Sequence, residues 1–168
     1  VSQKIINANK IKNICDKYNI LFIVNDSADL AKEVDSDGVH VGQNDDTIKY
    51  CKKILSEDKI IGSSNNSMQE IYKSIKAKVD YLAIGKVFET NTMGKRDRNI
   101  VGLDLITETK KITNIPIVAI GGINKNNAEK VIKSGAHSIC VVSEIIKTSN
   151  PKLEANNFKR FFDNEKKI

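Results

Sequence analysis

The sequence has no tryptophan, and aromatic residues make up only 5% of its 168 residues. Proteins that bind nucleic acid by stacking its bases place aromatic side chains among basic ones. Here the net charge is +6, but the lysines are spread over the expected outer faces of helices, for example at Lys49, Lys52, Lys73 and Lys110. We therefore expect no nucleic-acid partner, although a positive field would favour a phosphorylated substrate.

Cysteines and long apolar runs are also scarce. Cys15, Cys51 and Cys140 are odd in number and far apart, without a Cys-x-x-Cys pair, which argues against a disulfide framework and a zinc site. No stretch approaches the roughly 20 apolar residues of a membrane span. The first residues also lack the basic and apolar regions of a secretory signal. These features predict a cytoplasmic protein with no membrane partner.

Six short runs rich in β-branched residues predict six strands. They cover residues 21–24, 38–41, 60–61, 81–84, 115–120 and 138–142. Between them apolar residues recur at helical spacing, as at Ile11, Ile14, Cys15 and Tyr18, and we interpret such stripes as faces that pack on the core. Strict alternation of strand and helix predicts parallel strands joined by helical crossovers in one α/β domain.

Both a doubly wound open sheet and a closed barrel fit this alternation. A dinucleotide-binding sheet would need Gly-x-Gly-x-x-Gly after a strand, and the sequence offers only Gly121-Gly122. We therefore favour a (β/α)8 barrel of the TIM type. Because such a barrel takes about 250 residues, we expect residues 1–168 to be a single barrel domain that is incomplete at its N-terminus, with its first strands missing from this chain.

Acidic side chains follow the first two expected strands. Asn25 and Asp26 end the first strand, and Gln43 and Asp45 follow the second. Two carboxylates from adjacent strands suit Mg²⁺ beside the oxygens of a substrate phosphate. The alternative is that each aspartate caps the helix that follows it.

Small residues follow the last two expected strands. Gly121 and Gly122 precede a helix expected to begin near Asn124, so backbone N–H groups there could bind a phosphate. Val142 and Ser143 offer the same at the end of the last strand, and barrel enzymes often bind phosphate at this position. The alternative is that the glycines only permit a tight turn.

The connection over residues 85–102 is long for a loop between a strand and a helix. Thr90 and Thr92 could bind an anionic substrate, while Lys95, Arg96 or Arg98 neutralises its charge. The alternative is a solvated loop without a binding role. By contrast, His40 and His137 have no partner at nucleophile spacing, and we interpret both as structural.

Five of these motifs, in this order, resemble the thiamine phosphate synthase family. They are Phe-Ile-Val-Asn-Asp at 22–26, Gly-Val-His-Val-Gly-Gln-Asn-Asp at 38–45, Gly-Ser-Ser at 62–64, Thr-Asn-Thr at 90–92 and Ile-Gly-Gly-Ile at 120–123. The resemblance implies a Mg²⁺-dependent transferase that joins hydroxymethylpyrimidine diphosphate to thiazole phosphate and releases pyrophosphate.

The resemblance also implies roles for individual residues. Asp26 and Asp45 would bind Mg²⁺, and Asn25 and Ser64 would contact the pyrimidine diphosphate. The thiazole phosphate would be bound by the following residues: Thr90, Asn91, Thr92, Gly121, Gly122, Val142 and Ser143.

The sequence departs from the family in two places. The family places a lysine after its Thr-x-Thr motif, whereas this chain has Met93, and we hypothesise that Lys95 takes the catalytic role of that lysine. The family also has two earlier strands with a Gln-x-Arg-type motif that binds diphosphate. Since these do not precede Val1, we expect this chain to be part of a longer polypeptide, and the alternative is a truncated gene product.

Two other functions are compatible with the pattern. A thiazole tautomerase of the same superfamily would have a histidine near Asn66, and none is present there. A non-catalytic barrel remnant that binds phosphate ligands is the other alternative.

Overall fold

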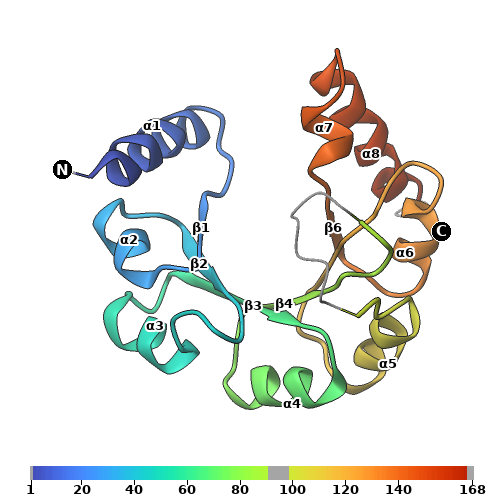
Figure 1. Ribbon diagram of the computed structural model, residues 1–168, viewed down its shortest axis with the longest axis horizontal. Helices are drawn as coiled ribbons and strands as arrows, with labels where there is room; N and C mark the ends of the chain where they lie inside the picture. The colour runs from blue at the N-terminus through green and yellow to red at the C-terminus, as the bar shows by residue number, and fades with distance from the viewer. Residues whose placement is uncertain (1, 91–98, 166–168) are drawn as a thin grey trace. The chain divides into compact units, whose positions relative to one another are not determined.

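The structure is a computed structural model that describes residues 2–90 and 99–165 (Figure 1). Strands and helices alternate along the chain, as predicted. Its elements are α1 (Gln3–Lys17), β1 (Ile23–Asn25), α2 (Ala28–Glu33), β2 (Gly38–Val41), α3 (Ile48–Ile54), β3 (Ile60–Asn65), α4 (Met68–Lys76), β4 (Tyr81–Ile84), α5 (Asp104–Ile112), β5 (Ile117–Ile120), α6 (Ala128–Lys133), β6 (Ser138–Cys140), α7 (Ser143–Ile146) and α8 (Pro151–Glu165).

The chain divides into two compact units. Unit 1 comprises Val1–Ser64 and Lys73–Tyr81, and unit 2 comprises Asn65–Tyr72 and Leu82–Ile168. In unit 1, β1 pairs with β2 and β2 with β3, all in parallel. In unit 2, β4 pairs with β5 and β5 with β6, again in parallel. The predicted parallel α/β architecture is therefore confirmed within each unit.

The core of unit 1 lies between its strands and the helices that follow them. In it α2 packs against β1, β2 and α3 (Figure 1). Small and β-branched side chains fill this layer, among them Val24, Ala31, Val39 and Cys51. Because these residues are short, the helices can lie close to the strands, and the strand ends that follow are held on a rigid frame.

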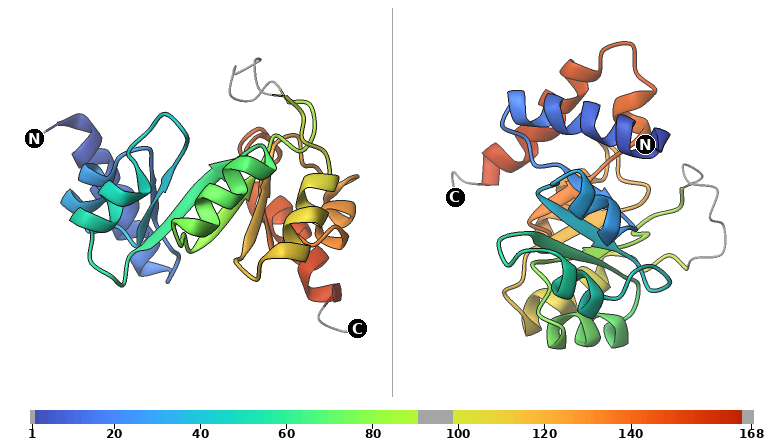
Figure 2. Two further views of the ribbon diagram at one scale, coloured as in Figure 1. Left: turned by 90° about the horizontal axis from the view of Figure 1, so that it is seen from below. Right: turned by 90° about the vertical axis from the view of Figure 1, so that its left-hand side faces the viewer.

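The core of unit 2 is built from larger aliphatic side chains. Leu82, Ile106, Ile117 and Val131 are fully buried. In this unit α5 packs on β5 and α6 on β6, while α8 packs against α6 and α7, as can be followed in Figure 2. Among residues 2–90 and 99–165, no helix combines the length and the apolar character needed to cross a bilayer.

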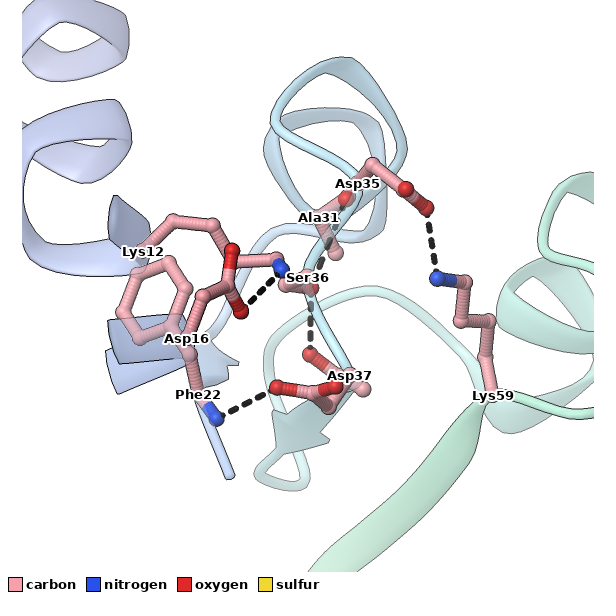
Figure 3. A network of polar contacts seen from close by, with 9 residues as sticks. Lys12, Asp16, Phe22, Ala31, Asp35, Ser36, Asp37 and Lys59 are labelled. Atoms are coloured by element: carbon pink, nitrogen blue, oxygen red, sulfur yellow. Dashed lines mark hydrogen bonds and ion pairs between the residues drawn. The ribbon is translucent and has the colours of Figure 1, made fainter. Parts of the chain in front are cut away.

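Polar groups near the N-terminal ends of the unit 1 strands form a structural network (Figure 3). The Asp37 carboxylate accepts a hydrogen bond from the Phe22 N–H at 2.7 Å, and the Asp37 carbonyl accepts one from the Ile60 N–H at 2.9 Å. Ser36 is buried and donates to the Gly38 carbonyl at 2.8 Å. These bonds join residues at or just before the starts of three strands, at the ends opposite those that carry the predicted site residues.

The apolar stripe predicted for α1 faces inward only at Cys15, which is half-buried. Ile14 and Tyr18 are 58% and 63% exposed, whereas Ala8 is only 7% exposed. The inward face runs through Ile5, Ala8 and Lys12, which share helical spacing. The face was mispredicted because small Ala8 packs closely and the stem of Lys12 lies against the unit while its ammonium group binds Asp16.

Side-chain hydrogen bonds mark the starts of two helices. The Asn150 side chain accepts a hydrogen bond from the Leu153 N–H at 3.1 Å, directly before Pro151 opens α8. Ser67 accepts from the Glu70 N–H at 3.3 Å, while the Glu70 carboxylate reaches back to the Asn66 N–H at 2.6 Å. The capping box of α4 is thus present with its return bond moved one residue earlier.

Candidate functional site

The first predicted site region lies where β1 and β2 end. Asn25 is paired with His40 in the parallel ladder, and the Asp26 N–H donates to the His40 carbonyl at 2.8 Å. Asp26 has a φ of 71°, a left-handed conformation that turns the chain sharply out of the strand. Asn25 and Asp26 both line a hollow beside the start of α1.

Neither predicted metal ligand is the residue that caps the next helix. Ser27 caps α2 by accepting from the Leu30 N–H, and Thr47 caps α3 by accepting from the Tyr50 N–H. The alternative reading of Asp26 and Asp45 as N-caps is therefore wrong. Hydroxyl side chains one or two residues further along take that place, which leaves the two carboxylates exposed at the strand ends.

Asp45 closes the loop that follows β2. Its Oδ2 atom accepts a hydrogen bond from the Gly42 N–H at 2.7 Å. In the same loop, the Gln43 amide donates to the Ser64 carbonyl at 2.9 Å and so ties the loop to the end of β3. These bonds fix the position of the Asp45 carboxylate while leaving it exposed to solvent.

Asp46 joins this loop to the loop after β1. Its Oδ2 atom accepts a hydrogen bond from the Ala28 N–H, the first residue of α2, at 2.8 Å. A carboxylate at the N-terminal end of a helix is favoured by the helix dipole. The sequence reasoning missed this residue because the bond spans 18 positions and has no local signature.

The structure also brings together three side chains that the sequence did not connect. His40 Nε2 lies 2.8 Å from Ser64 Oγ, and His40 Nδ1 lies 2.9 Å from Tyr81 Oη. The reading of His40 as a histidine with satisfied ring nitrogens is thus confirmed. No sequence spacing indicated the contact with Ser64, because it comes from the parallel pairing of β2 with β3.

Burial of the ring lowers the pKa of His40 below its usual value, and the negative charge of Asp45 opposes this effect. The imidazole is consequently neutral at neutral pH, so that one ring nitrogen donates and the other accepts. His137, by comparison, accepts from the Ile117 N–H through Nδ1 at 2.9 Å and is structural, as predicted.

The donor set of the first region fits a hard cation only in part. Asp26 and Asp45 offer carboxylate oxygens, the ligand type that Mg²⁺ prefers. Within the described parts of the chain, no three His, Cys, Asp or Glu side chains are grouped as a metal site. A Mg²⁺ ion here would complete its shell with water and substrate oxygens, which is the usual way in which this ion is bound.

The second predicted region, in unit 2, is a pocket of about 410 Å³. The ends of β5 and β6 and the loop after β4 form its wall. Its lining includes five of the predicted site residues: Thr90, Gly121, Gly122, Val142 and Ser143. The two turns and one of the threonines that were predicted to contact a phosphate thus share one cavity.

The glycine turn of this pocket is held by backbone contacts. Gly121 and Gly122 have φ values of 102° and 64°, a region that glycine adopts at less cost than residues with a side chain. The Gly121 carbonyl accepts from the Phe88 N–H at 3.0 Å, and the Gly122 carbonyl accepts from the Asn127 side-chain amide at 3.0 Å. These bonds fix both peptide planes before any ligand arrives.

The helix expected to begin near Asn124 begins four residues later, at Ala128. The Asn124 N–H donates to the Asn127 side chain, and the Asn126 N–H donates to the Asn124 side chain. Two asparagines therefore stabilise a turn in place of the first helical turn. The prediction that the start of this helix lies next to the glycines is wrong, and the pocket depends on the glycine turn itself.

Charges of both signs line the pocket. Glu89, Glu144 and Lys147 all contribute to its wall. Glu89 accepts from the Lys86 ammonium at 2.8 Å, and this hydrogen bond lowers the pKa of the Glu89 carboxyl. The Lys86 ammonium thus offsets one of the negative charges nearest to a bound anion.

Three further predicted residues, Asn91, Thr92 and Lys95, lie outside the residues that the structure describes, as do Met93, Arg96 and Arg98. The roles expected for them stay predictions.

Comparisons with known proteins identify the same family along most of the chain. A family model described as thiamine monophosphate synthase matches residues 2–145. The thiamine-phosphate synthase of Persephonella marina is 42% identical over 154 residues, 92% of this chain and 73% of that protein. The enzyme of the same name from Clostridium tetani is 40% identical over 156 residues, 93% of this chain and 74% of that protein.

Among solved structures, thiamine phosphate pyrophosphorylase from Pyrococcus furiosus matches with a TM-score of 0.88 and 32% identity. The match covers 96% of this chain and 77% of that one. It confirms the predicted α/β fold of the TIM-barrel type.

Proposed function

Because this chain belongs to the thiamine monophosphate synthase family, we propose that it joins hydroxymethylpyrimidine diphosphate to thiazole phosphate and releases pyrophosphate. In this transfer the bond between the pyrimidine methylene carbon and the diphosphate oxygen breaks, and its electron pair leaves with the diphosphate. The thiazole nitrogen then supplies the pair for the new carbon–nitrogen bond. We expect the reaction to take place in the cytoplasm.

One structural observation supports this proposal in addition to family membership. The Gly121–Gly122 turn and the Val142–Ser143 turn line the same pocket together with Thr90. Backbone N–H groups of such turns are suited to phosphate oxygens, and a threonine hydroxyl can donate to one more. We assign this pocket to the phosphate of the thiazole substrate, which it would hold and orient.

We assign the diphosphate substrate to the strand ends of unit 1. Asp26 and Asp45 supply the hard oxygen ligands for Mg²⁺, and Asn25 and Ser64 supply polar contacts to the substrate. Mg²⁺ bound there would neutralise the charge that develops on the departing diphosphate. The chain's own contribution is to hold the two carboxylates on loops that are fixed by the Gly42–Asp45 and Ala28–Asp46 hydrogen bonds.

The test is to incubate the purified protein with both substrates, with and without Mg²⁺, and to measure thiamine phosphate and pyrophosphate. We expect both products in equal amounts, and only when Mg²⁺ is present. Isomerisation of the thiazole without pyrophosphate release would instead indicate the tautomerase, although Asn66 stands where its histidine is expected. Binding of pyrophosphate without any product would indicate a non-catalytic protein.

A further inference from the structure

The contact between His40 and Ser64 places a neutral ring beside a residue assigned to the diphosphate substrate. His40 alternates along β2 with Val39 and Val41, which are both buried in the core. Its ring therefore leaves the opposite face of the strand. There Nε2 lies 2.8 Å from the Ser64 hydroxyl and Nδ1 lies 2.9 Å from the Tyr81 hydroxyl.

A neutral imidazole between two hydroxyl groups allows two orders of hydrogen bonding. In the first, Tyr81 donates to Nδ1 and the Nε2–H group donates to Ser64. In the second, the Nδ1–H group donates to Tyr81 and Ser64 donates to Nε2. The two orders differ in what Ser64 can offer a ligand: a proton in the first, only lone pairs in the second.

We propose that His40 is a positioning residue that orients the Ser64 hydroxyl as a donor toward the diphosphate, with Tyr81 setting the tautomer of the ring. This inference rests on the proposed function. The charged oxygens of a diphosphate are hydrogen-bond acceptors, so Ser64 contacts them by donating. The first order of hydrogen bonds leaves the Ser64 proton available, whereas the second directs it to His40.

The backbone around Ser64 supports this role. The Gln43 side chain donates to the Ser64 carbonyl at 2.9 Å, so the residue is held from its main chain as well as its side chain. Ser64 is half-buried, which limits competition from water for its hydroxyl.

The position of Tyr81 depends on a glycine. A Cβ atom at Gly62 would overlap the ring and hydroxyl of Tyr81. The missing side chain thus creates the space in which the ring stacks against His40, with ring centroids 5.5 Å apart and planes 21° apart. Gly62, Tyr81, His40 and Ser64 form one chain of contacts from the middle of β3 back to its end.

The experiment combines Tyr81→Phe and His40→Asn with Ser64→Ala in double-mutant cycles. Tyr81→Phe retains the ring and removes only the donor. We expect Ser64→Ala to weaken pyrophosphate binding in the presence of Mg²⁺ by about tenfold, and each of the other two changes to weaken it by about threefold. In the Ser64→Ala background neither should weaken it further, because the hydroxyl that they orient is gone.

His137→Asn is the matched control, since both ring nitrogens of His137 also lie near polar groups: Nδ1 accepts from the Ile117 N–H and Nε2 lies 2.9 Å from Lys110 Nζ. It should leave pyrophosphate binding unchanged in both backgrounds. The same cycles on turnover should show the same pattern. Failure of the wild-type protein to make thiamine phosphate, with pyrophosphate binding retained, would reject the proposed function and leave the binding cycles to decide this inference.

A second measurement reads the hydrogen-bond order directly, without substrate. The ¹⁵N chemical shifts of His40 distinguish the two neutral tautomers, and we expect Nε2 to carry the proton in the wild-type protein. Tyr81→Phe should shift the ring toward a mixture of both tautomers. A proton on Nδ1 in the wild-type protein, additive losses in the cycles, or no binding of pyrophosphate by the wild-type protein would each overturn the inference.

Discussion

The two units build their candidate sites by different means. In unit 1 the polar groups are side chains that hold one another, as His40 holds Ser64 and Asp46 holds the start of α2. In unit 2 the pocket is shaped by main chain, with Gly121 and Gly122 locked through their own carbonyls. We therefore expect the site in unit 1 to be sensitive to changes in side-chain chemistry. The pocket in unit 2 should instead be sensitive to any atom added to its backbone.

The largest effect should come from the carboxylates of unit 1. Asp45→Asn retains the shape of the side chain but removes its charge, so we expect turnover at fixed Mg²⁺ to fall by about 100-fold or more. The measurement is turnover as a function of Mg²⁺ concentration. Asp58→Asn is the control, because Asp58 is an exposed aspartate in the loop between α3 and β3. Equal Mg²⁺ dependence of the two variants would contradict the assignment.

A single methyl group should have the next largest effect, in unit 2. A Cβ atom at Gly122 would lie 2.5 Å from the Glu89 carbonyl and 2.8 Å from Phe88 Cβ. We expect Gly122→Ala to raise the KM for thiazole phosphate at least about tenfold and to lower the free energy of unfolding by about 1–3 kcal/mol.

Gly102 provides the matched control for this change. Its φ of 68° is close to the 64° of Gly122, but a Cβ atom there would meet nothing within 4 Å. Gly102→Ala therefore carries the same conformational strain without the overlap. If the two alanine variants lose equal stability in chemical denaturation, the close approach at Gly122 is irrelevant.

The atoms that an added Cβ would overlap also differ between the units. Gly62→Ala in unit 1 meets the side chain of Tyr81, so we expect a loss of about 1–3 kcal/mol in the free energy of unfolding that becomes smaller in a Tyr81→Ala background. At Gly122 the obstacle is largely main chain, and truncating a neighbour should bring little relief. Chemical denaturation of the wild-type protein, the two single variants and the double variant tests this, and additive losses would show that the Tyr81 ring is not the obstacle.

The smallest effect should come from protonation of His137. This residue contributes to the stability of unit 2 and not to a candidate site. Burial and the neighbouring Lys110 lower the pKa of His137 below its usual value. As the pH falls through about 6.5 the unfolded chain takes up a proton that the folded protein resists, so stability declines. We expect the Tm to fall less between pH 7.5 and 5.5 in His137→Gln than in the wild-type protein. An identical fall would show that His137 does not contribute.

Local patterns predicted the strands and helices but misplaced some of their ends. The first strand begins at Ile23 and not at residue 21, because the Phe22 N–H bonds to the Asp37 side chain and not to a neighbouring strand. The third strand runs on to Asn65, past the expected apolar pair. Its polar residues were not expected in a strand, yet Ser63 is buried and bonded to the Ser74 hydroxyl at 2.9 Å.

The candidate site was predictable where its residues lie just beyond strand ends, as Asp26, Asp45, Gly122 and Ser143 do. The partners of those residues were not. His40 meets Ser64 and Tyr81 across 24 and 41 positions of sequence, and no pattern within one strand encodes such a contact. Register between strands creates these pairs, and register is set by the whole unit.

The bond from the Ala28 N–H to Asp46 has a consequence for how a cation would be captured. It joins the segments that carry Asp26 and Asp45. Binding of an ion would then require little ordering of these segments, so little binding free energy would be lost to that cost. Release of pyrophosphate together with the ion would also leave the segments folded between turnovers.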